Sequence, residues 1–330
     1  MAAVSCTSTE YIDMEELDTA LVINAQMNTE EDVHTIHLNT STRSSINKAP
    51  GASVKVSING GPLIDAAELE EQPGNSTQYV FYETIKAGYS VEIKAQKEGL
   101  TANASFTVPP MPEISDKELE CDVPHSSGPV FESAQGTASY KPDENAPYSL
   151  ETWHLLKVKV KDIPSQKSYY RITLGIERVS VNEGETTISR HPIMADFSSE
   201  PALSASISSS ADLVSALENS NPYNTFTDDM FPDNEYTLKI YISESSFYYY
   251  RYRSPEQAPE DYKIFLTATL HSISQGEYIY IKALGQNNLG FLFSEPVSIP
   301  SNVDSGLGYA DASSSVMVKI PLETFTLDSD

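Results

Sequence analysis

Short runs of alternating apolar and polar residues fill the first third of the chain. In Val54–Ile58 and again in Tyr89–Ile93 every second residue is apolar, as expected for strands with one buried and one solvated face. The turn residues Asn59–Pro62 follow the first run. Similar runs recur from Leu21 to Val108 (LVINAQM, VHTIHL, ASVKVSI, TQYVFY, YSVEIKA and TANASFTV). Their spacing predicts a β-sandwich over residues 19–108.

A proline cluster marks the predicted domain boundary. Pro109, Pro110 and Pro112 cannot continue a sheet ladder and favour an extended connector. The stretch 109–148 is rich in Pro, Ser, Gly and acidic residues, so it is either an ordered strand with long loops or a flexible insert. With residues 1–18 as an N-terminal tether, the pattern predicts a second, larger β-rich domain over residues 149–330.

Further strand-like runs define this second domain. HLLKVKV and YYRITLGIERV predict an antiparallel hairpin, and TLKIYIS, SFYYYRYR, YKIFLTATL and SSVMVKIPL predict later strands. Ser210 or Asp212 suits the N-cap of a helix in DLVSALEN, and Ser274 with Glu277 forms a capping box before EYIYIKALGQ. The second segment also suits a strand, but we expect a helix. The predicted fold class is all-β with one or two short helices.

The charge balance restricts the partners. The 330 residues carry 47 Asp and Glu against 21 Lys and Arg, a formal net charge of -26, which repels a phosphate backbone and argues against nucleic acid. Such a surface suits solubility, divalent cations or basic protein patches. No window approaches the roughly 20 apolar residues of a transmembrane helix.

Cys6 stands in the segment AVSC, before a polar run. Small residues ahead of a cysteine are typical of a bacterial lipobox, in which the thiol is acylated and the diacylglycerol anchors the protein to a membrane. The charged and apolar regions of a signal peptide are missing ahead of it. A free thiol and a disulfide between Cys6 and Cys121 are the alternatives.

The sequence shows no recognisable catalytic motif. His34 and His37 lie in a predicted strand, where residues three apart point to opposite faces, so they are not expected to share a metal ion. Zinc-protease, nucleophile-elbow and phosphate-loop patterns are missing. We therefore expect no enzyme and no cofactor; an enzyme of unfamiliar mechanism would need a deep pocket with perturbed titratable groups.

An acidic loop offers oxygen ligands. Asp228, Asp229 and Asp233, with Asn234 and Glu235, are calcium candidates, although their spacing is not that of a twelve-residue calcium loop. A solvated acidic loop is the alternative interpretation.

A tyrosine run is the candidate ligand platform. If Phe247–Tyr252 is a strand, Tyr248, Tyr250 and Tyr252 share one face, and exposed rings there would stack on a glycan or a peptide. Alternatively, one face fills the core and the other covers a loop or a domain interface.

The ordered series of motifs resembles the domain-of-unknown-function 4249 family, lipoproteins of Bacteroidota. The matching segments are, in order, Cys6, Leu21–Ala25, VHTIHL, APGASVKVSING, YSVEIKA running to VPP, YYRITLGIE, TFTDDMF, YKIFLTATLHSISQGEYIY and FSEPVSIPSNVDSGLGYADASSSVMV. This chain departs from the family in the closing motif. The usual SNV-GG-GIFG pattern is replaced by Ser301–Tyr309 (SNVDSGLGY), which keeps the turn residues.

The resemblance implies an immunoglobulin-like N-terminal sandwich and an exported protein held at the outer membrane or cell surface by its lipid anchor only. It also implies a TonB-dependent outer-membrane transporter as a partner and supplies no catalytic residues. We expect a binding lipoprotein that assists nutrient capture. A structural or adhesive surface protein without a small-molecule ligand is the alternative.

Overall fold

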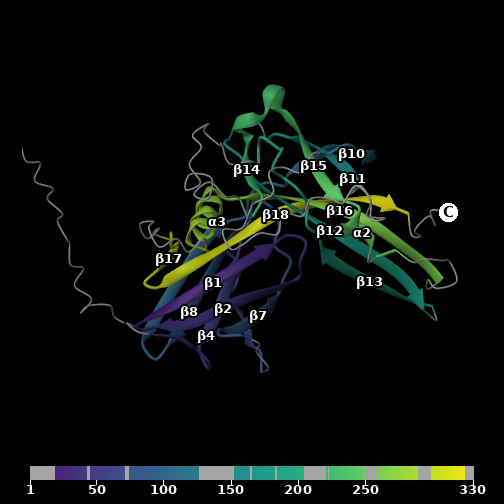
Figure 1. The fold of residues 1–330 in the computed structure, drawn as a ribbon. Coiled ribbons are helices and arrows are strands. Elements are labelled where there is room, and N and C mark those ends of the chain that lie inside the picture. The colour runs from purple at the N-terminus through teal and green to yellow at the C-terminus, as the bar shows by residue number, and fades with distance from the viewer. Residues whose placement is uncertain are drawn as a thin grey trace, which may run out of the picture. The chain divides into compact units, whose positions relative to one another are not determined.

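The chain folds into two compact units that consist mainly of β-strands (Figure 1). Unit 1 contains Met1–Val108 and Pro300–Ala312, and unit 2 contains Pro109–Ile299 and Ser313–Asp330. The predicted all-β fold class with short helices is confirmed. The computed structural model describes residues 19–42, 45–70, 74–125, 152–163, 166–182, 184–203, 221, 223–248, 250–251, 258, 260–288 and 299–323.

Unit 1 is a sandwich of two sheets. Its strands are β1 (Ala20–Asn28), β2 (Val33–Ser41), β3 (Ile46–Lys48), β4 (Ser53–Ile58), β5 (Ile64–Asp65), β6 (Ala67–Glu68), β7 (Thr77–Tyr82), β8 (Ser90–Lys97), β9 (Leu100–Thr107), β17 (Val303–Asp304) and the first part of β18 (Leu307–Leu322). One sheet has the order β18-β1-β2-β7-β6, with β3 beside β2. The other has the order β17-β9-β8-β4-β5.

Alternation along the strands builds the core of unit 1. In β1 the buried residues Leu21 and Ile23 alternate with half-buried ones, and in β8 Val91 and Ile93 are fully buried between exposed neighbours. These apolar faces meet in one hydrophobic cluster between the sheets. The alternation seen in the sequence therefore marks the faces that bury.

The closing motif of the sequence returns to unit 1 as a turn between β17 and β18. Gly308 has a φ of +105°, and a Cβ there would meet the Ile23 carbonyl oxygen at 2.1 Å. The Asn24 Oδ1 accepts a hydrogen bond from the Tyr309 amide at 3.2 Å. Close packing of the backbone against β1 thus requires a glycine at position 308 of this motif. The prediction placed residues 300–312 in the second domain, but they belong to unit 1.

Unit 2 is a second, larger sandwich. One sheet has the order β13-β12-β16-β18, with β14 beside β12, and the other has the order β10-β11-β15. The elements are β10 (Glu113–Val123), β11 (Trp153–Lys161), β12 (Tyr169–Asn182), β13 (Glu185–Pro192), β14 (Thr225–Thr227), η2 (Asp228–Met230), η3 (Pro232–Asn234), β15 (Glu235–Ser243), α2 (Ser245–Tyr248), β16 (Glu260–Ile273), α3 (Gln275–Asn288) and the second part of β18.

The strands β11 and β12 do not form the predicted hairpin. β11 pairs with β10 and β15, whereas β12 pairs with β13, β14 and β16. Apolar residues of β11 and β12 instead meet across the core that separates the two sheets. The expectation was wrong because chain proximity and complementary patterns do not select the partner strand.

Residues 113–123 of the expected connector form β10, an ordered strand of unit 2, and the boundary at Val108 agrees with the division into units. The expected helix in DLVSALEN lies outside the described residues.

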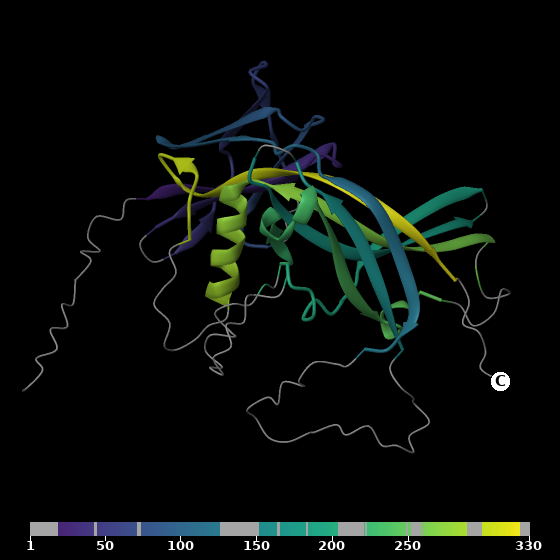
Figure 2. The same ribbon diagram turned by 90° about the horizontal axis from the view of Figure 1, so that it is seen from above.

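The helix α3 begins as the capping box predicts. The Ser274 Oγ accepts a hydrogen bond from the Glu277 amide at 3.0 Å, and the Ser274 carbonyl accepts one from the Tyr278 amide. Figure 2 shows α3 as a separate coil beside the strands. In the part of the chain that the structure describes, no helix has the length and apolar character to cross a bilayer.

Candidate functional site

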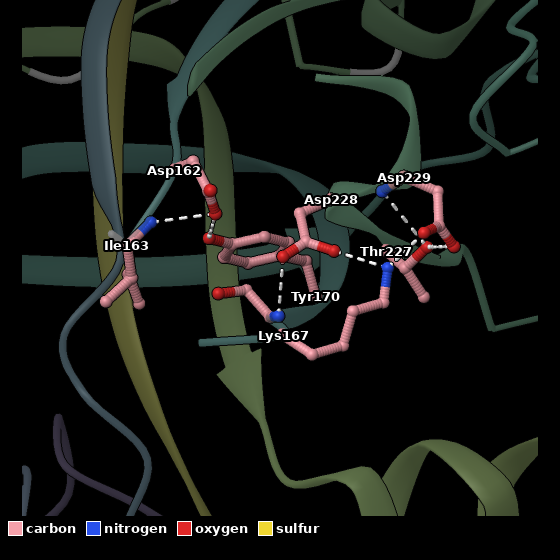
Figure 3. Close-up of polar contacts among 8 residues, drawn as sticks. Asp162, Ile163, Lys167, Tyr170, Thr227, Asp228 and Asp229 are labelled. Atoms are coloured by element: carbon pink, nitrogen blue, oxygen red, sulfur yellow. Dashed lines mark hydrogen bonds and ion pairs between the residues drawn. The ribbon is translucent and has the colours of Figure 1, made fainter. Parts of the chain in front are cut away.

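The predicted acidic loop contacts the residues that precede β12, and Lys167 from that segment pairs with two of its aspartates. The Lys167 Nζ is 2.5 Å from the Asp228 Oδ1 and also contacts the Asp229 Oδ1 (Figure 3). The Asp228 Oδ2 accepts a hydrogen bond from the Ser168 amide at 2.8 Å. The Asp229 Oδ2 accepts a second bond from the Thr227 hydroxyl at 2.7 Å. These aspartates therefore hold two loops together.

The charges of this cluster stabilise one another. Partial burial lowers the pKa of Lys167, but the Asp228 and Asp229 carboxylates outweigh it and raise this pKa. Lys167 and then Thr227 lower the pKa of Asp229. The lysine thus supplies the positive charge that a calcium ion would otherwise bring.

The third calcium candidate lies apart from this pair. Asp233 has a positive φ of 55° within η3 and takes no part in the contacts of Figure 3. Within the described ranges, no group of three or more His, Cys, Asp and Glu side chains is placed to hold a metal ion.

Beneath the aspartates, Tyr170 is fully buried in the core of unit 2. Its hydroxyl is 3.5 Å from the Asp162 Oδ1 (Figure 3). Burial raises the pKa of Tyr170 to about 12. Because the phenol stays neutral and the ring stacks on Phe226 and Phe231, Tyr170 is a structural residue of this loop cluster.

The predicted tyrosine platform is not a strand where the structure describes it. Ser245–Tyr248 forms the one-turn helix α2, and Phe247 is fully buried. Tyr250 is half-buried, packs on the unit 2 core, and lies 5.6 Å from the His191 ring. Tyr252 lies outside the described residues. The alternation that placed these tyrosines on one face does not apply, because α2 interrupts it.

A different pair of tyrosines lies where α3 meets β12. The rings of Tyr169 and Tyr278 are 5.2 Å apart at 45°, and both side chains are half-buried. The Lys282 Nζ lies 5.6 Å from the centre of the Tyr278 ring, and burial lowers the pKa of Lys282. Partly accessible rings with a nearby cation can bind a flat or ring-shaped ligand.

Arg171 extends this surface along β12. It lies two residues beyond Tyr169, on the same face of the strand, and pairs in register with His271 of β16. The His271 Nε2 and the Thr173 Oγ1 share a hydrogen bond of 3.1 Å. Tyr169, Tyr278, Lys282 and Arg171 together are called the α3 surface below, and His271 is buried beside Arg171.

Two other polar clusters of unit 2 are structural. His154 is buried and contacts Glu244, which also pairs with Arg251. Glu177 is buried and bridges Arg190 and Lys319. Each cluster pairs a carboxylate with cationic or imidazole groups of the same unit, which favours a structural role.

The two histidines of β2 confirm their predicted orientation. His34 is buried and its Nε2 lies 3.0 Å from the Glu83 carbonyl oxygen, whereas His37 bonds the Ser76 hydroxyl at 2.8 Å.

Cys6 lies outside the described residues, so its lipidation stays a prediction. Cys121 is exposed in β10.

Comparison with known proteins places the chain in a family. A family model for a domain of unknown function (DUF4249) matches residues 8–318. The chain belongs to this family. The match spans both units, and the family description assigns no activity. No curated protein matches the chain.

Two solved structures show a distant similarity to this chain, and neither assigns a function to it. The crystal structure of a DUF4785 family protein from Legionella pneumophila is 9% identical, with a TM-score of 0.22; 76% of this chain and 52% of that chain are covered. This chain thus spans about half the length of that protein. The BSP domain of a biofilm associated protein is 6% identical, with a TM-score of 0.16, and the match covers 97% of this chain and 62% of that one.

Sequence reasoning missed the α3 surface. Tyr169 and Tyr278 stand in segments that were correctly assigned to a strand and to a helix, but 109 residues separate them and no local pattern brings them together. One signal was present: Tyr278 and Lys282 are four residues apart in a predicted helix, a spacing that puts them on the same side.

Proposed function

We propose that this protein is an exported, lipid-anchored binding protein that holds its ligand at the α3 surface of unit 2. The half-exposed pair Tyr169 and Tyr278 carries the proposal. Tyrosine rings offer broad apolar contact and a polar hydroxyl, which suits sugars and peptides. No covalent step is needed for this role, so we propose binding rather than catalysis.

Binding at the tyrosine pair is tested on glycan and peptide arrays with the purified protein. Tyr278→Ala should lose the array signal, because the ring is the contact surface, while the exposed Tyr82 in unit 1 provides the control Tyr82→Ala. Tyr278→Phe should keep most of the signal if stacking dominates. Silence of the parent protein on both arrays would favour the structural or adhesive alternative.

The anchor is proposed at Cys6. The AVSC segment and the family resemblance support it. Full-length expression with radiolabelled palmitate should label the parent and Cys121→Ala but not Cys6→Ala. Equal labelling of Cys6→Ala would contradict the anchor and leave the binding surface untouched.

We further propose that the anchored protein acts at the outer membrane or cell surface beside a TonB-dependent transporter in nutrient capture. The resemblance to anchored surface lipoproteins supports this location. Chemical cross-linking in the native membrane, followed by purification of the chain, should recover such a transporter. Recovery of the chain alone would oppose the partnership.

A further inference from the structure

Arg171 occupies a central strand of unit 2. β12 pairs with β14 through Arg171 and Thr225, and with β16 through Arg171 and His271. The alternate residues Tyr170 and Ile172 fill the core, so Arg171 points to the other face of the sheet. This face is open to solvent close by, because Thr173 is exposed.

The guanidinium of Arg171 has no anionic partner in the described part of the chain. Its Nε is buried without a hydrogen-bond acceptor. The other half-buried arginines of the described part of unit 2 have partners: Arg251 pairs with Glu244, and the Arg178 guanidinium bonds the Ser189 hydroxyl and lies over the Tyr250 ring. Among these arginines, Arg171 is the one whose buried Nε lacks an acceptor in the described residues, and buried donors normally have one.

His271, the register partner of Arg171 on β16, leaves this positive charge uncompensated. Burial and the charge of Arg171 lower the pKa of His271 to about 3, so the imidazole is neutral at physiological pH. The Thr173 hydroxyl, bonded to His271, is neutral as well. The planar fork of an arginine suits two oxygens of a carboxylate or sulfate group.

The strand environment favours a saccharide over a peptide. Both edges of β12 are paired at Arg171, so an extended peptide cannot add to this strand by backbone hydrogen bonds. The rings of Tyr169 on β12 and Tyr278 on α3 contact each other, and aromatic rings of this kind can stack on the face of a sugar. Thr173 adds a hydroxyl for polar contact on the same face.

We propose, building on the binding function above, that Arg171 binds the carboxylate or sulfate group of an acidic saccharide whose sugar ring lies against Tyr169 and Tyr278. The charge would fix the orientation of the sugar, and the rings would supply contact area. The site requires no metal ion and no covalent change.

Calorimetric titration of the purified full chain at physiological salt tests the assignment. The probes are an oligogalacturonate and its methyl-esterified form, a heparin oligosaccharide and its desulfated form, and a polyglutamate peptide. At least one acidic saccharide should bind ten times more tightly than its uncharged counterpart. Arg171→Gln should weaken that binding tenfold or more, and Arg171→Lys several-fold, because an ammonium keeps the charge but not the fork.

A matched control separates the site from the overall charge. Lys263 is an exposed lysine on the neighbouring strand β16. Lys263→Gln changes the net charge by the same amount and should alter affinity less than twofold. An equal loss in both variants would overturn the assignment, because it would reflect general electrostatics.

Thermal melting provides a second readout. Arg171→Gln should melt at or above the temperature of the parent, since Arg171 gives up no ion pair. A melting temperature several degrees lower would identify a structural role and overturn the proposal.

The binding outcomes distinguish the two proposals. If Tyr278→Ala abolishes saccharide binding and Arg171→Gln does not change it, the α3 surface stands and the Arg171 assignment fails. Binding of polyglutamate alone overturns the saccharide. Absence of binding by the parent to every probe overturns the acidic-saccharide assignment, and silence on the arrays as well overturns the surface.

Discussion

The Asn302 side chain pairs with both backbone groups of Ala310. Its amide donates to the Ala310 carbonyl at 2.7 Å, and its Oδ1 accepts from the Ala310 amide at 2.9 Å. Ala310 is fully buried, so water cannot replace these bonds. The Asn302 side chain thus provides the hydrogen-bond partners of the Ala310 backbone at this turn.

Asn302→Ala should destabilise unit 1 by about 2–3 kcal/mol, because two buried backbone groups lose their partners. Asn302→Asp should rescue little, since a carboxylate cannot donate to the Ala310 carbonyl. Hydrogen exchange at the Ala310 amide measures the effect and should accelerate in both variants. Ser301→Ala removes only a 3.3 Å contact to the Val303 amide and provides the control; unchanged exchange in Asn302→Ala would contradict the assignment.

Gly308→Ala should be among the most damaging single changes in unit 1. Its φ of +105° is unfavourable for alanine, and the new Cβ would overlap the Ile23 carbonyl oxygen. Gly51 also has a positive φ, of +70°, but nothing lies within 4 Å of a Cβ there. Chemical denaturation should show a loss of about 1 kcal/mol for Gly51→Ala and several times more for Gly308→Ala; similar losses would show that the turn can shift.

Tyr250→Ala should lower the melting temperature of unit 2. The ring packs on the core, on His191 and under the guanidinium of Arg178, and truncating a half-buried aromatic costs about 2–3 kcal/mol, or roughly 5–10 °C in a domain of this size. Tyr250→Phe should melt like the parent. An unchanged melt of Tyr250→Ala would restore the tyrosine run as a ligand platform.

Glu177 should make unit 2 sensitive to acid. Burial raises the pKa of this carboxyl, but Lys319 and Arg190 outweigh it and lower the pKa below its ordinary value. Its contribution to stability is therefore fully present above the unfolded-state pKa of roughly 4.3 and disappears as pH falls through the lower folded-state pKa.

Glu177→Gln should cost about 2 kcal/mol at pH 7, the worth of hydrogen bonds to a charged group. The difference in melting temperature between the parent and Glu177→Gln should shrink as the pH falls below about 4. Glu113→Gln, which breaks an exposed ion pair with Lys161, should have little effect at either pH. If the difference in melting temperature stayed constant from pH 7 to pH 3, the charge of Glu177 would contribute nothing to the stability of unit 2.

Local chemistry predicted local structure well. The alternation in Val54–Ile58 predicted a strand in which Val54 and Val56 are buried as expected, although Ser57 is buried as well and Ile58 is only half-buried. Ser274 with Glu277 predicted the start of α3. Each of these two features depends on residues within one turn or one strand, so a short stretch of sequence is enough to predict it.

Strand partners and site residues could not be predicted in this way. β11 and β12 each suit any neighbour with an apolar face, and only the complete set of strands decides the pairing. Phe247 lies in a β-forming run, but its burial as part of α2 overrides that propensity. Tyr169 and Tyr278 meet through the packing of α3 on β12, and no spacing in the sequence encodes that contact.

The division of β18 between the units has a consequence for the order of folding. Leu307–Ala312 completes unit 1, yet it follows all of Pro109–Ile299 in the chain. During synthesis the strands up to Val108 therefore emerge without the strand that borders β1 and without β17, which borders β9. Two sheet edges stay unpaired until Val303–Ala312 has been made. The hydrogen bond between Asn24 and Tyr309 then joins residues 285 positions apart, and such a separation makes the completion of unit 1 slow. A chain that ends before residue 300 should aggregate through these edges.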